Sequence, residues 1–273
     1  MVLIVGCGDL GGEIARLLSI AGHQVTGVRA SNKPLSAPIQ VIQADVTKPA
    51  SLSELEALKP EILIYCVAAN GQSDENYKAH YVDGLKNVIA TQANNHALQR
   101  VIFVSSTRGY GQKTDTILDE NTPAIPADFG GERLLEAENV LKQLPCEAIS
   151  MRLSGIYGKG RLYLVNMAKE PNRWPQENAW SNRIHRDDAA RFIAFCCEKE
   201  QVADCYIVTD DMPTQQYEVL TWLASKQGVD VAHIKTPAVQ GGKRLSNQRM
   251  RDTGFKLQYP NYQVGYGEIL KNV

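Results

Sequence analysis

Short runs of apolar residues alternate with longer amphipathic segments along the first half of the chain. Residues 2–6 (VLIVG) form the first run, and apolar side chains then recur at helical spacing from Leu10 to Leu18, with Gly22 placed to end that helix. Because nearly every position in the runs is apolar, we expect strands that are covered on both faces. The predicted strands lie at 2–6, 24–28, 39–44, 61–69, 100–106 and 148–156, and further helices near 51–58, 75–95 and 131–144.

This alternation predicts an α/β fold with a doubly wound parallel sheet of the Rossmann type. The rhythm loosens after residue 157, where aromatic residues, arginines and prolines precede a predicted helix at 188–199. A strand at 205–210, a helix at 214–227 and a polar tail complete the chain. We therefore expect a Rossmann domain over 1–157 and a smaller C-terminal substrate lobe over 158–273, and leave open whether that lobe returns strands to the sheet.

The composition is that of an ordinary globular protein, with 44% hydrophobic and 22% charged residues. The 29 basic and 30 acidic residues nearly balance, which argues against a nucleic acid or a membrane surface as partner. No window approaches the roughly 18 apolar residues of a membrane span, and the first residues lack the basic region of a signal peptide. The six cysteines form no CxxC pair, so we expect free thiols and a cytoplasmic location.

The stretch GCGDLG at 6–11 has the G-x-G-x-x-G spacing of a dinucleotide-binding loop. It follows a predicted strand and opens a predicted helix, which is the context that this motif requires. Gly6 permits the tight turn, Gly8 lets a pyrophosphate approach the backbone, and Gly11 lets helix and strand pack closely. The sequence therefore predicts a nucleotide at the N-terminus of this helix.

Arg29 ends the second predicted strand, eighteen residues beyond Gly11. A site for NAD would carry an acidic residue here for the ribose 2′-hydroxyl, but no carboxylate occurs between Glu13 and Asp45. An arginine suits a 2′-phosphate, and Ser31 and Lys33 are near enough in sequence to assist. We therefore predict NADP rather than NAD as cofactor. Asp45, after the third strand, either accepts a hydrogen bond from adenine or caps the following helix.

Several stretches together resemble the extended short-chain dehydrogenase/reductase superfamily, in its NAD(P)-dependent epimerase/dehydratase group. They are GCGDLG at 6–11, ADV at 44–46, YCVAA at 65–69, FVSSTRGYG at 103–111, DENTP at 119–123, MRLSGIYGKG at 151–160 and IHRDDAA at 184–190. The resemblance covers nearly the whole chain. It implies an enzyme that binds NAD(P) on the Rossmann domain and acts on a sugar nucleotide or another carbonyl substrate under the C-terminal lobe. Homodimers through the helices flanking the sheet are a habit of the family.

The same resemblance implies which residues line the cofactor: Gly6, Gly8, Asp9, Leu10, Gly11, Arg29, Asp45, Val46, Ala68, Ala69, Ser105 and Arg133. Ser105 and Ser106 would end the strand beside the nicotinamide. Thr107 would take the place of the Ser or Thr that hydrogen-bonds to the reacting oxygen.

The sequence departs from the family at its catalytic pair. In the family, DExxPxxP leads into Tyr-x-x-x-Lys, where the tyrosine transfers the proton and the lysine holds the ribose. Here DENTPAIP is intact, but Phe129 falls at the tyrosine position and Arg133 at the lysine position. Phenylalanine cannot transfer a proton, whereas arginine keeps a charge and donors for ribose or phosphate.

A substitute proton donor must lie elsewhere if the protein is an enzyme. Tyr110, Thr107 and Glu132 are candidates, and we favour Tyr110, with a packing role as its alternative. For the substrate, Arg161, Trp174 and Arg183 combine guanidiniums with an aromatic and could bind a phosphorylated or planar molecule. The alternative is solvated arginines beside tryptophans of the lobe core. His185, Asp187 and Asp188 more simply mark a helix start than a metal site, and we predict no metal.

Two functions follow from these residues. The first is an NADP-dependent oxidoreductase or epimerase-like enzyme, with a small-molecule substrate and a remodelled catalytic site. The second is a non-catalytic sensor or regulatory protein that binds NADP(H). A purely structural protein is a third reading, which the complete phosphate loop disfavours.

Overall fold

The structure, a computed structural model, describes residues 1–271 and divides into two compact units. The first unit comprises residues 1–111, 124–152 and 189–206, and the second comprises residues 112–123, 153–188 and the chain from Ile207 onward. The sequence predicted a single boundary at residue 157. Instead the chain returns to the first unit over 189–206, because the last strand of the sheet comes from this late part of the sequence.

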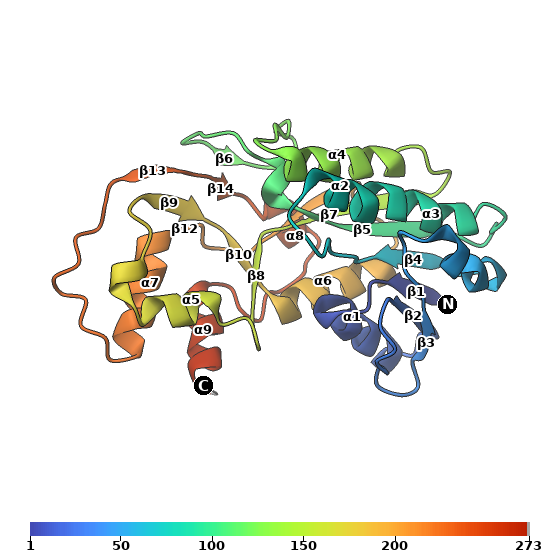
Figure 1. Ribbon diagram of the computed structural model, residues 1–273, viewed down its shortest axis with the longest axis horizontal. Coiled ribbons are helices and arrows are strands. Elements are labelled where there is room, and N and C mark those ends of the chain that lie inside the picture. The colour runs from blue at the N-terminus through green and yellow to red at the C-terminus, as the bar shows by residue number, and fades with distance from the viewer. Residues whose placement is uncertain (272–273) are drawn as a thin grey trace. The chain divides into compact units, whose positions relative to one another are not determined.

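The predicted strands form one seven-stranded sheet in the order β11-β7-β5-β4-β1-β2-β3 (Figure 1). Its strands are β1 (Val2–Val5), β2 (Val25–Arg29), β3 (Gln40–Gln43), β4 (Ile62–Tyr65), β5 (Arg100–Ser106), β7 (Glu147–Leu153) and β11 (Cys205–Val208). Strand β1 pairs in parallel with both β2 and β4, and β2–β3 and β4–β5 are parallel as well. The chain runs outward from β1 to β3 and then turns back to β4, which confirms the predicted doubly wound fold.

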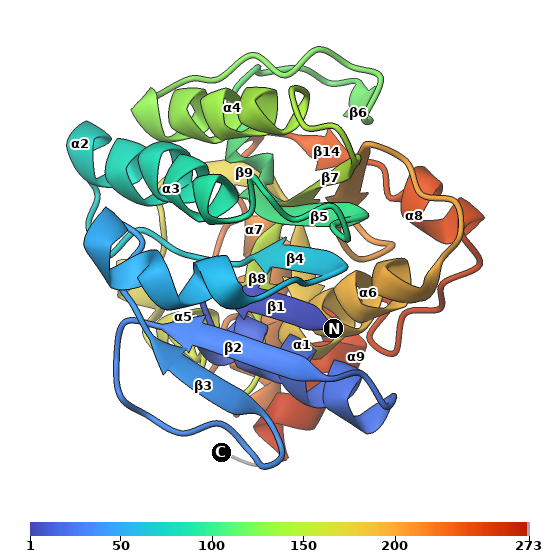
Figure 2. The ribbon, with the colours of Figure 1, turned by 90° about the vertical axis from the view of Figure 1, so that its right-hand side faces the viewer.

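Alternate residues of the strands face two helical layers. Leu3 and Val5 of β1 share a buried core with Leu63, Tyr65 and Phe103 and with the helices η1, α3 and α4. Figure 2 shows α1 and α6 on the opposite side of the sheet from α3 and α4. These helices are α1 (Asp9–Ile20), η1 (Pro49–Ala57), α2 (Asp74–Tyr77), η2 (Lys78–Asp83), α3 (Gly84–Thr91), α4 (Phe129–Leu141) and α6 (Arg186–Glu198), and the short turn η3 (Thr107–Gly109) follows β5.

The helix predicted at 75–95 consists of three segments, since the π-helical η2 separates α2 from α3. The hydroxyl of Tyr65 on β4 donates a hydrogen bond to the carbonyl of His80 within η2. Gly84 follows, where a Cβ would lie 2.5 Å from the Tyr65 hydroxyl oxygen. The wider turn thus fits the helix around a buried tyrosine of the sheet, which the hydrophobic pattern alone could not indicate.

The strand predicted at 148–156 breaks at Ser154. Strand β7 ends at Leu153, and β8 (Gly155–Tyr157) pairs with β10 (Arg183–His185) in a separate sheet. Two more small sheets, β12-β9-β13 and β14-β6, belong to the second unit. Their strands are β6 (Ile117–Leu118), β9 (Asn178–Ser181), β12 (Thr214–Gln215), β13 (Val239–Gly242) and β14 (Arg244–Leu245).

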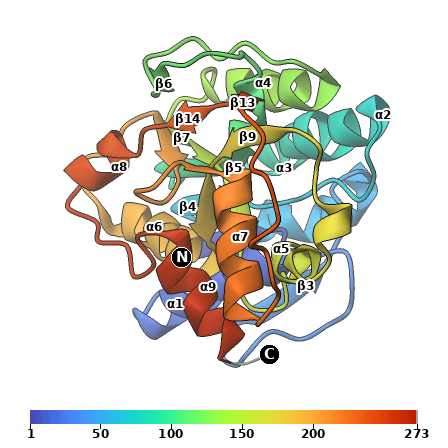
Figure 3. The same cartoon turned by 90° about the vertical axis from the view of Figure 1, so that its left-hand side faces the viewer.

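Helices α5, α7 and α9 of the second unit share a core that contains Trp174, Tyr217 and Tyr262 (Figure 3). The helices of this unit are α5 (Tyr163–Ala168), η4 (Pro171–Arg173), α7 (Gln216–Lys226), α8 (Gln248–Asp252) and α9 (Tyr262–Leu270). Within residues 1–271, none of the helices has both the length and the apolar character needed to cross a membrane.

Candidate functional site

The loop GCGDLG lies between β1 and α1, and two of its three glycines, Gly6 and Gly11, are sterically required. Gly6 has φ +97°, and a Cβ there would lie 2.5 Å from the backbone of Cys66. A Cβ on Gly11 would overlap the carbonyl oxygen of Gly6. A Cβ on Gly8, the N-cap residue of α1, would meet no atom within 4 Å. The helix end is therefore open, its first N–H groups can reach an anion, and the cradle fits a pyrophosphate.

Arg29 is the last residue of β2, where the sequence placed the group that selects the cofactor. Its Nη1 donates to the carbonyl of Lys33 at 3.2 Å, so the arginine is tied to the loop that follows. Its Nε is buried and has no hydrogen-bond partner among the described residues. A buried donor without a partner is costly, and an incoming anion would satisfy it.

Asp45 follows β3, and its Oδ1 accepts hydrogen bonds from the Thr47 amide at 3.0 Å and the Thr47 hydroxyl at 2.7 Å. These bonds lower the pKa of Asp45. The side chain forms a turn around Thr47 instead of capping η1, whose N-cap residue is Lys48. Its role toward adenine stays a prediction.

The other predicted cofactor residues lie beside the glycine loop or at the ends of central strands. Asp9 is exposed and Leu10 is buried on the first turn of α1. Val46 is buried, and its carbonyl accepts from the Asn87 side chain at 2.9 Å. Ala68 and Ala69 follow β4, where Ala69 bonds through its backbone to the hydroxyl of Tyr81.

A buried polar network occupies the end of β5. Ser105 donates to Oε1 of Glu138 at 2.6 Å, and Glu138 forms an ion pair with Arg152 at 2.6 Å. Nη1 of Arg152 donates to the hydroxyl of Tyr110 at 2.6 Å, and its guanidinium lies over the Tyr110 ring. Tyr110 is 0% exposed. Tyr110 is therefore packed in the interior against Arg152, which is the alternative role that the sequence left open for it. Thr107 is buried in the turn η3 after the strand.

An aromatic and cationic cluster surrounds Phe129, which the sequence predicts at the tyrosine position of the family. Phe129, the first residue of α4, packs edge-on against Tyr77 with ring centroids 5.5 Å apart. Arg108, immediately after Thr107, lies over both rings. Its Nη1 donates to the Tyr77 hydroxyl at 2.7 Å, and its Nε binds Asp128, the N-cap residue of α4, at 2.9 Å.

Arg133, at the position of the family lysine, is engaged by two carboxylates. Its Nε and Nη2 bind Asp74 at 2.7 and 2.8 Å, and its Nη1 binds Glu136 at 2.7 Å. The hydrogen bond from Arg133 lowers the pKa of Asp74. The charge that was expected to hold a ribose is thus largely neutralised within the protein. Glu132, the third proton-donor candidate, is exposed on the first turn of α4.

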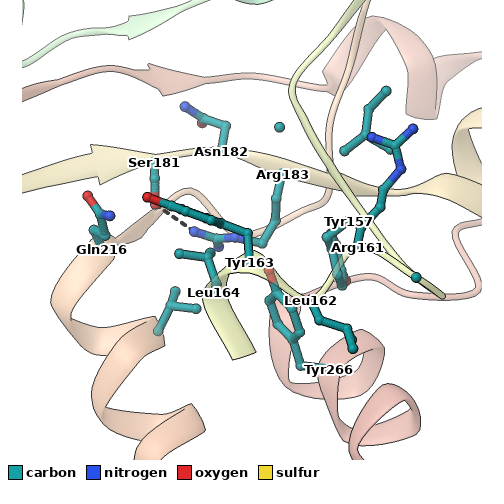
Figure 4. Close-up of a pocket in the computed structure, with 14 residues that line it drawn as sticks. Tyr157, Arg161, Leu162, Tyr163, Leu164, Ser181, Asn182, Arg183, Gln216 and Tyr266 are labelled. Atoms are coloured by element: carbon teal, nitrogen blue, oxygen red, sulfur yellow. Dashed lines mark hydrogen bonds between the residues drawn. The ribbon is translucent and has the colours of Figure 1, made fainter. Parts of the chain in front are cut away.

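A cavity of about 630 Å³ lies within the second unit (Figure 4). It contains two of the predicted substrate residues, Arg161 and Arg183, but their guanidiniums lie well apart in the close-up. Trp174 does not line it: that indole is buried and donates to the Met167 carbonyl at 3.0 Å. The cavity is lined by Gly155–Tyr157, Gly160–Leu164, Ser181–Arg183, Gln216, Val219 and Tyr266.

Arg183 is the principal polar feature of this cavity. It is 4% exposed, its Nη2 donates to Ser181 at 2.6 Å, and its Nη1 has no partner among the described residues. The hydroxyl of Tyr157, another residue of the lining, is also buried without a hydrogen-bond partner among the described residues, as is Oδ2 of Asp210 outside the lining. Burial raises the pKa of Asp210 to about 7. A ligand with polar or anionic groups would satisfy donors that the protein leaves unpaired.

The acidic start of α6 has a structural role. Asp188 is 0% exposed, and its carboxylate accepts from the amides of Gln258 at 2.9 Å and Tyr259 at 2.7 Å. His185 stacks on the ring of Tyr259, and burial lowers its pKa. Asp188 therefore anchors the bend at 258–259 from the first turn of α6, where Asp187 and Asp188 mark the start of the helix. Among residues 1–271, no three side chains of metal-ligating type gather at one point.

Comparison with known proteins decides the family. The profile of the NAD dependent epimerase/dehydratase family matches residues 2–208. The chain belongs to this family. Protein YeeZ of Escherichia coli K12 is 26% identical over 278 residues, which cover 95% of this chain and 96% of YeeZ.

Solved structures extend the likeness over the second unit. A protein from Methylobacillus flagellatus, described as a candidate NAD-dependent epimerase/dehydratase, is 46% identical with a TM-score of 0.91, covering 99% of this chain and 97% of that one. WbmG of Bordetella bronchiseptica, an enzyme solved with NAD and UDP, is 17% identical with a TM-score of 0.83, covering 99% and 93%. At that identity, WbmG shows a shared fold.

Sequence reasoning missed Tyr77 and Arg108. Tyr77 comes from a short helix and Arg108 from the turn after β5, so no local spacing connects them. One signal was available: Gly130 and Gly131 stand together near the start of a helix, where glycine is unfavourable. A Cβ on Gly130 would overlap the Arg108 guanidinium, and one on Gly131 would lie 2.7 Å from the Arg108 carbonyl oxygen.

Proposed function

We propose that the protein is an NADP-dependent oxidoreductase or epimerase-like enzyme that acts on a small carbonyl or sugar-nucleotide substrate. The observation that carries the cofactor choice is Arg29. It stands where an NAD site would have a carboxylate, and its buried Nε lacks a partner in the described chain. A 2′-phosphate would supply that partner with a charge-assisted hydrogen bond. The glycine cradle would hold the pyrophosphate, and bound NADPH would supply the hydride.

The cavity of the second unit supports a substrate with an anionic part. Arg183 offers a buried, unpaired Nη1, and Tyr157 offers a buried hydroxyl. Both are donors, and diphosphate oxygens are acceptors only. WbmG was solved with UDP, and a nucleoside diphosphate of this kind would match that pair of donors. We also propose a cytoplasmic location, because all six cysteines, which lie within residues 1–271, are free thiols.

The test is a calorimetric titration with NADPH, NADP⁺, NADH and NAD⁺. We expect the 2′-phosphorylated forms to bind more tightly, and Arg29→Ala to weaken NADPH about 10- to 100-fold, as the loss of a charged hydrogen bond predicts. Arg16→Ala is the matched control, because it removes the same charge from an exposed position on α1. Equal affinity for NADPH and NADH in the wild type would refute the NADP assignment.

A non-catalytic NADP(H) sensor is the second candidate, and the cluster at α4 favours it specifically. Phe129 cannot transfer a proton, and Arg133 is held by Asp74 and Glu136. A sensor must bind the oxidised and reduced cofactors unequally, since equal binding shifts no equilibrium. The same titration therefore tests it: indistinguishable affinities for NADP⁺ and NADPH would exclude this function.

A further inference from the structure

We propose that Tyr77 and Arg108 replace the tyrosine and lysine that the family carries on α4. The inference rests on the proposed enzymatic function and names the group that transfers the proton. Tyr77 is the catalytic acid and base. Arg108 is a positioning residue that stabilises the phenolate formed when the proton leaves.

The geometry of the pair carries the proposal. Nη1 of Arg108 lies 2.7 Å from the Tyr77 hydroxyl oxygen, and the guanidinium carbon lies 5.0 Å from the centre of its ring. The Tyr77 ring packs on Phe129, so its hydroxyl belongs to the same cluster as the vacated tyrosine position. The hydroxyl also lies 3.3 Å from the side-chain oxygen of the exposed Gln72. The Tyr77 hydroxyl thus accepts from a cation on one side and donates to an exposed side chain on the other.

The neighbouring residues are arranged to hold this cation in place. Asp128 binds Nε of Arg108 through both carboxylate oxygens at 2.9 and 3.1 Å. Gly130 leaves the room that the Arg108 guanidinium occupies against the first turn of α4, and Gly131 lets that turn approach the Arg108 backbone. Phenylalanine at 129, glycine at 130 and an arginine after β5 are therefore mutually consistent.

The other candidates fit the role less well. Tyr110 has a similar arginine partner in Arg152, but it is 0% exposed and lies in the core of the first unit. Arg133 pairs with two carboxylates, whereas Arg108 pairs with one and also donates to a tyrosine hydroxyl. Tyr77 is buried as well, but its partner Arg108 has a side chain that is 31% exposed, which keeps the pair at the surface of the unit.

The chemical step is an ordinary carbonyl reduction with a different donor. Bound NADPH would supply a hydride to the carbonyl carbon and become NADP⁺, and the π electrons of the C=O bond would move to oxygen. That oxygen takes the proton of the Tyr77 hydroxyl and becomes the alcohol. Tyr77 is left as a phenolate beside Arg108, and solvent returns a proton to it. In the direction of oxidation the phenolate removes the alcohol proton.

The first experiment compares Tyr77→Phe with the wild type, using phenanthrenequinone as the carbonyl probe. We expect kcat to fall about 10²- to 10⁴-fold, the usual contribution of a positioned general acid. The dissociation constant for NADPH and the melting temperature should be unchanged. Tyr206→Phe is the matched control, since it removes a hydroxyl that accepts from the Ala203 amide, away from Tyr77 and Phe129. A Tyr77→Phe variant with wild-type kcat would overturn the proposal, as would a loss found in Tyr110→Phe instead.

A second experiment tests the pair by rescue. Arg108→Met should lower kcat with phenanthrenequinone while the dissociation constant for NADPH stays unchanged, because the guanidinium that donates to the Tyr77 hydroxyl is lost. Arg108→Lys should restore most of kcat, because it returns the positive charge. A wild-type kcat in Arg108→Met, or no rescue by Arg108→Lys, would overturn the pairing. A wild type that binds NADPH but turns over no carbonyl would overturn the catalytic role, while the titrations with NADPH would still judge the cofactor assignment separately.

Discussion

Replacing Glu138 with glutamine tests how much the first unit depends on its buried charges. Glutamine keeps the volume and one acceptor for Ser105, but it removes the negative charge that faces Arg152. The side chains of Glu138 and Arg152 are only 7% and 12% exposed, and their ion pair is 2.6 Å long. The variant therefore leaves a cation in a poorly solvated place. Its other neighbour, the Tyr110 hydroxyl, is neutral and cannot balance the charge.

Removing one partner of a buried ion pair typically costs about 3–5 kcal/mol. For a chain of this size each kcal/mol lowers the melting temperature by roughly 2–4 °C, so we expect a drop of about 6–20 °C. Differential scanning calorimetry measures the drop, and urea denaturation gives the free energy of unfolding. Glu136→Gln, on the same helix and also paired with an arginine, is the control. Its side chain is 37% exposed, and it should shift the midpoint far less.

The reasoning fails if Glu138→Gln and Glu136→Gln lose similar amounts of stability. A small loss would mean that water reaches Arg152 or that the cation finds another partner. A second variant, Glu138→Leu with Arg152→Met, tests whether the uncompensated charge causes the loss of stability, since it removes both charges. If burial is the cause of the loss, the double variant should be more stable than Glu138→Gln, because no uncompensated charge remains.

The remaining predictions concern the glycine loop, the second unit and α4. Gly11→Ala should destabilise the fold by about 1–3 kcal/mol, because its Cβ overlaps the Gly6 carbonyl; Gly8→Ala should keep the melting temperature but weaken NADPH in titrations. Burial raises the pKa of Asp210 from 3.8 to about 7, so the folded state binds the extra proton in that window and its stability should fall as pH rises through it. Asp210→Asn should abolish this dependence in urea denaturation, and an unchanged slope would contradict it. Arg133→Met should leave NADPH affinity unchanged, because two carboxylates already hold the guanidinium; weaker binding would return Arg133 to the cofactor site.

The sheet could be predicted because its strands are continuous apolar runs and their order follows from right-handed crossovers. The limits of β7 and β8 could not, because AISMRLSGI is uniformly strand-like and the change of sheet at Ser154 depends on what each half pairs with. The π-helical turn of η2 similarly depends on Tyr65, which comes from strand β4 and hydrogen-bonds to this turn. Local pattern fixes the elements, whereas their partners come from the tertiary structure.

The same distinction applies to the site. The glycine loop and Arg29 are read from sequence because a single turn and a strand end define them. Tyr77, Arg108 and Phe129 come from three separate elements, and only the fold brings them together. Trp174 neighbours arginines in sequence, which left open a substrate role or a place in the lobe core, and its large apolar surface is buried in the core of the second unit.

The late return of the chain to the first unit constrains how the protein emerges from the ribosome. The first half of strand β11 and most of α6 belong to this unit, yet they follow β7 by dozens of residues. A nascent chain that has just released β7 therefore exposes an incomplete sheet edge and an uncovered apolar face, both of which invite aggregation. The nucleotide loop is synthesised before most of the sheet on which it stands, and that sheet is finished only near residue 208. A cofactor bound early would thus favour folding while synthesis is still under way.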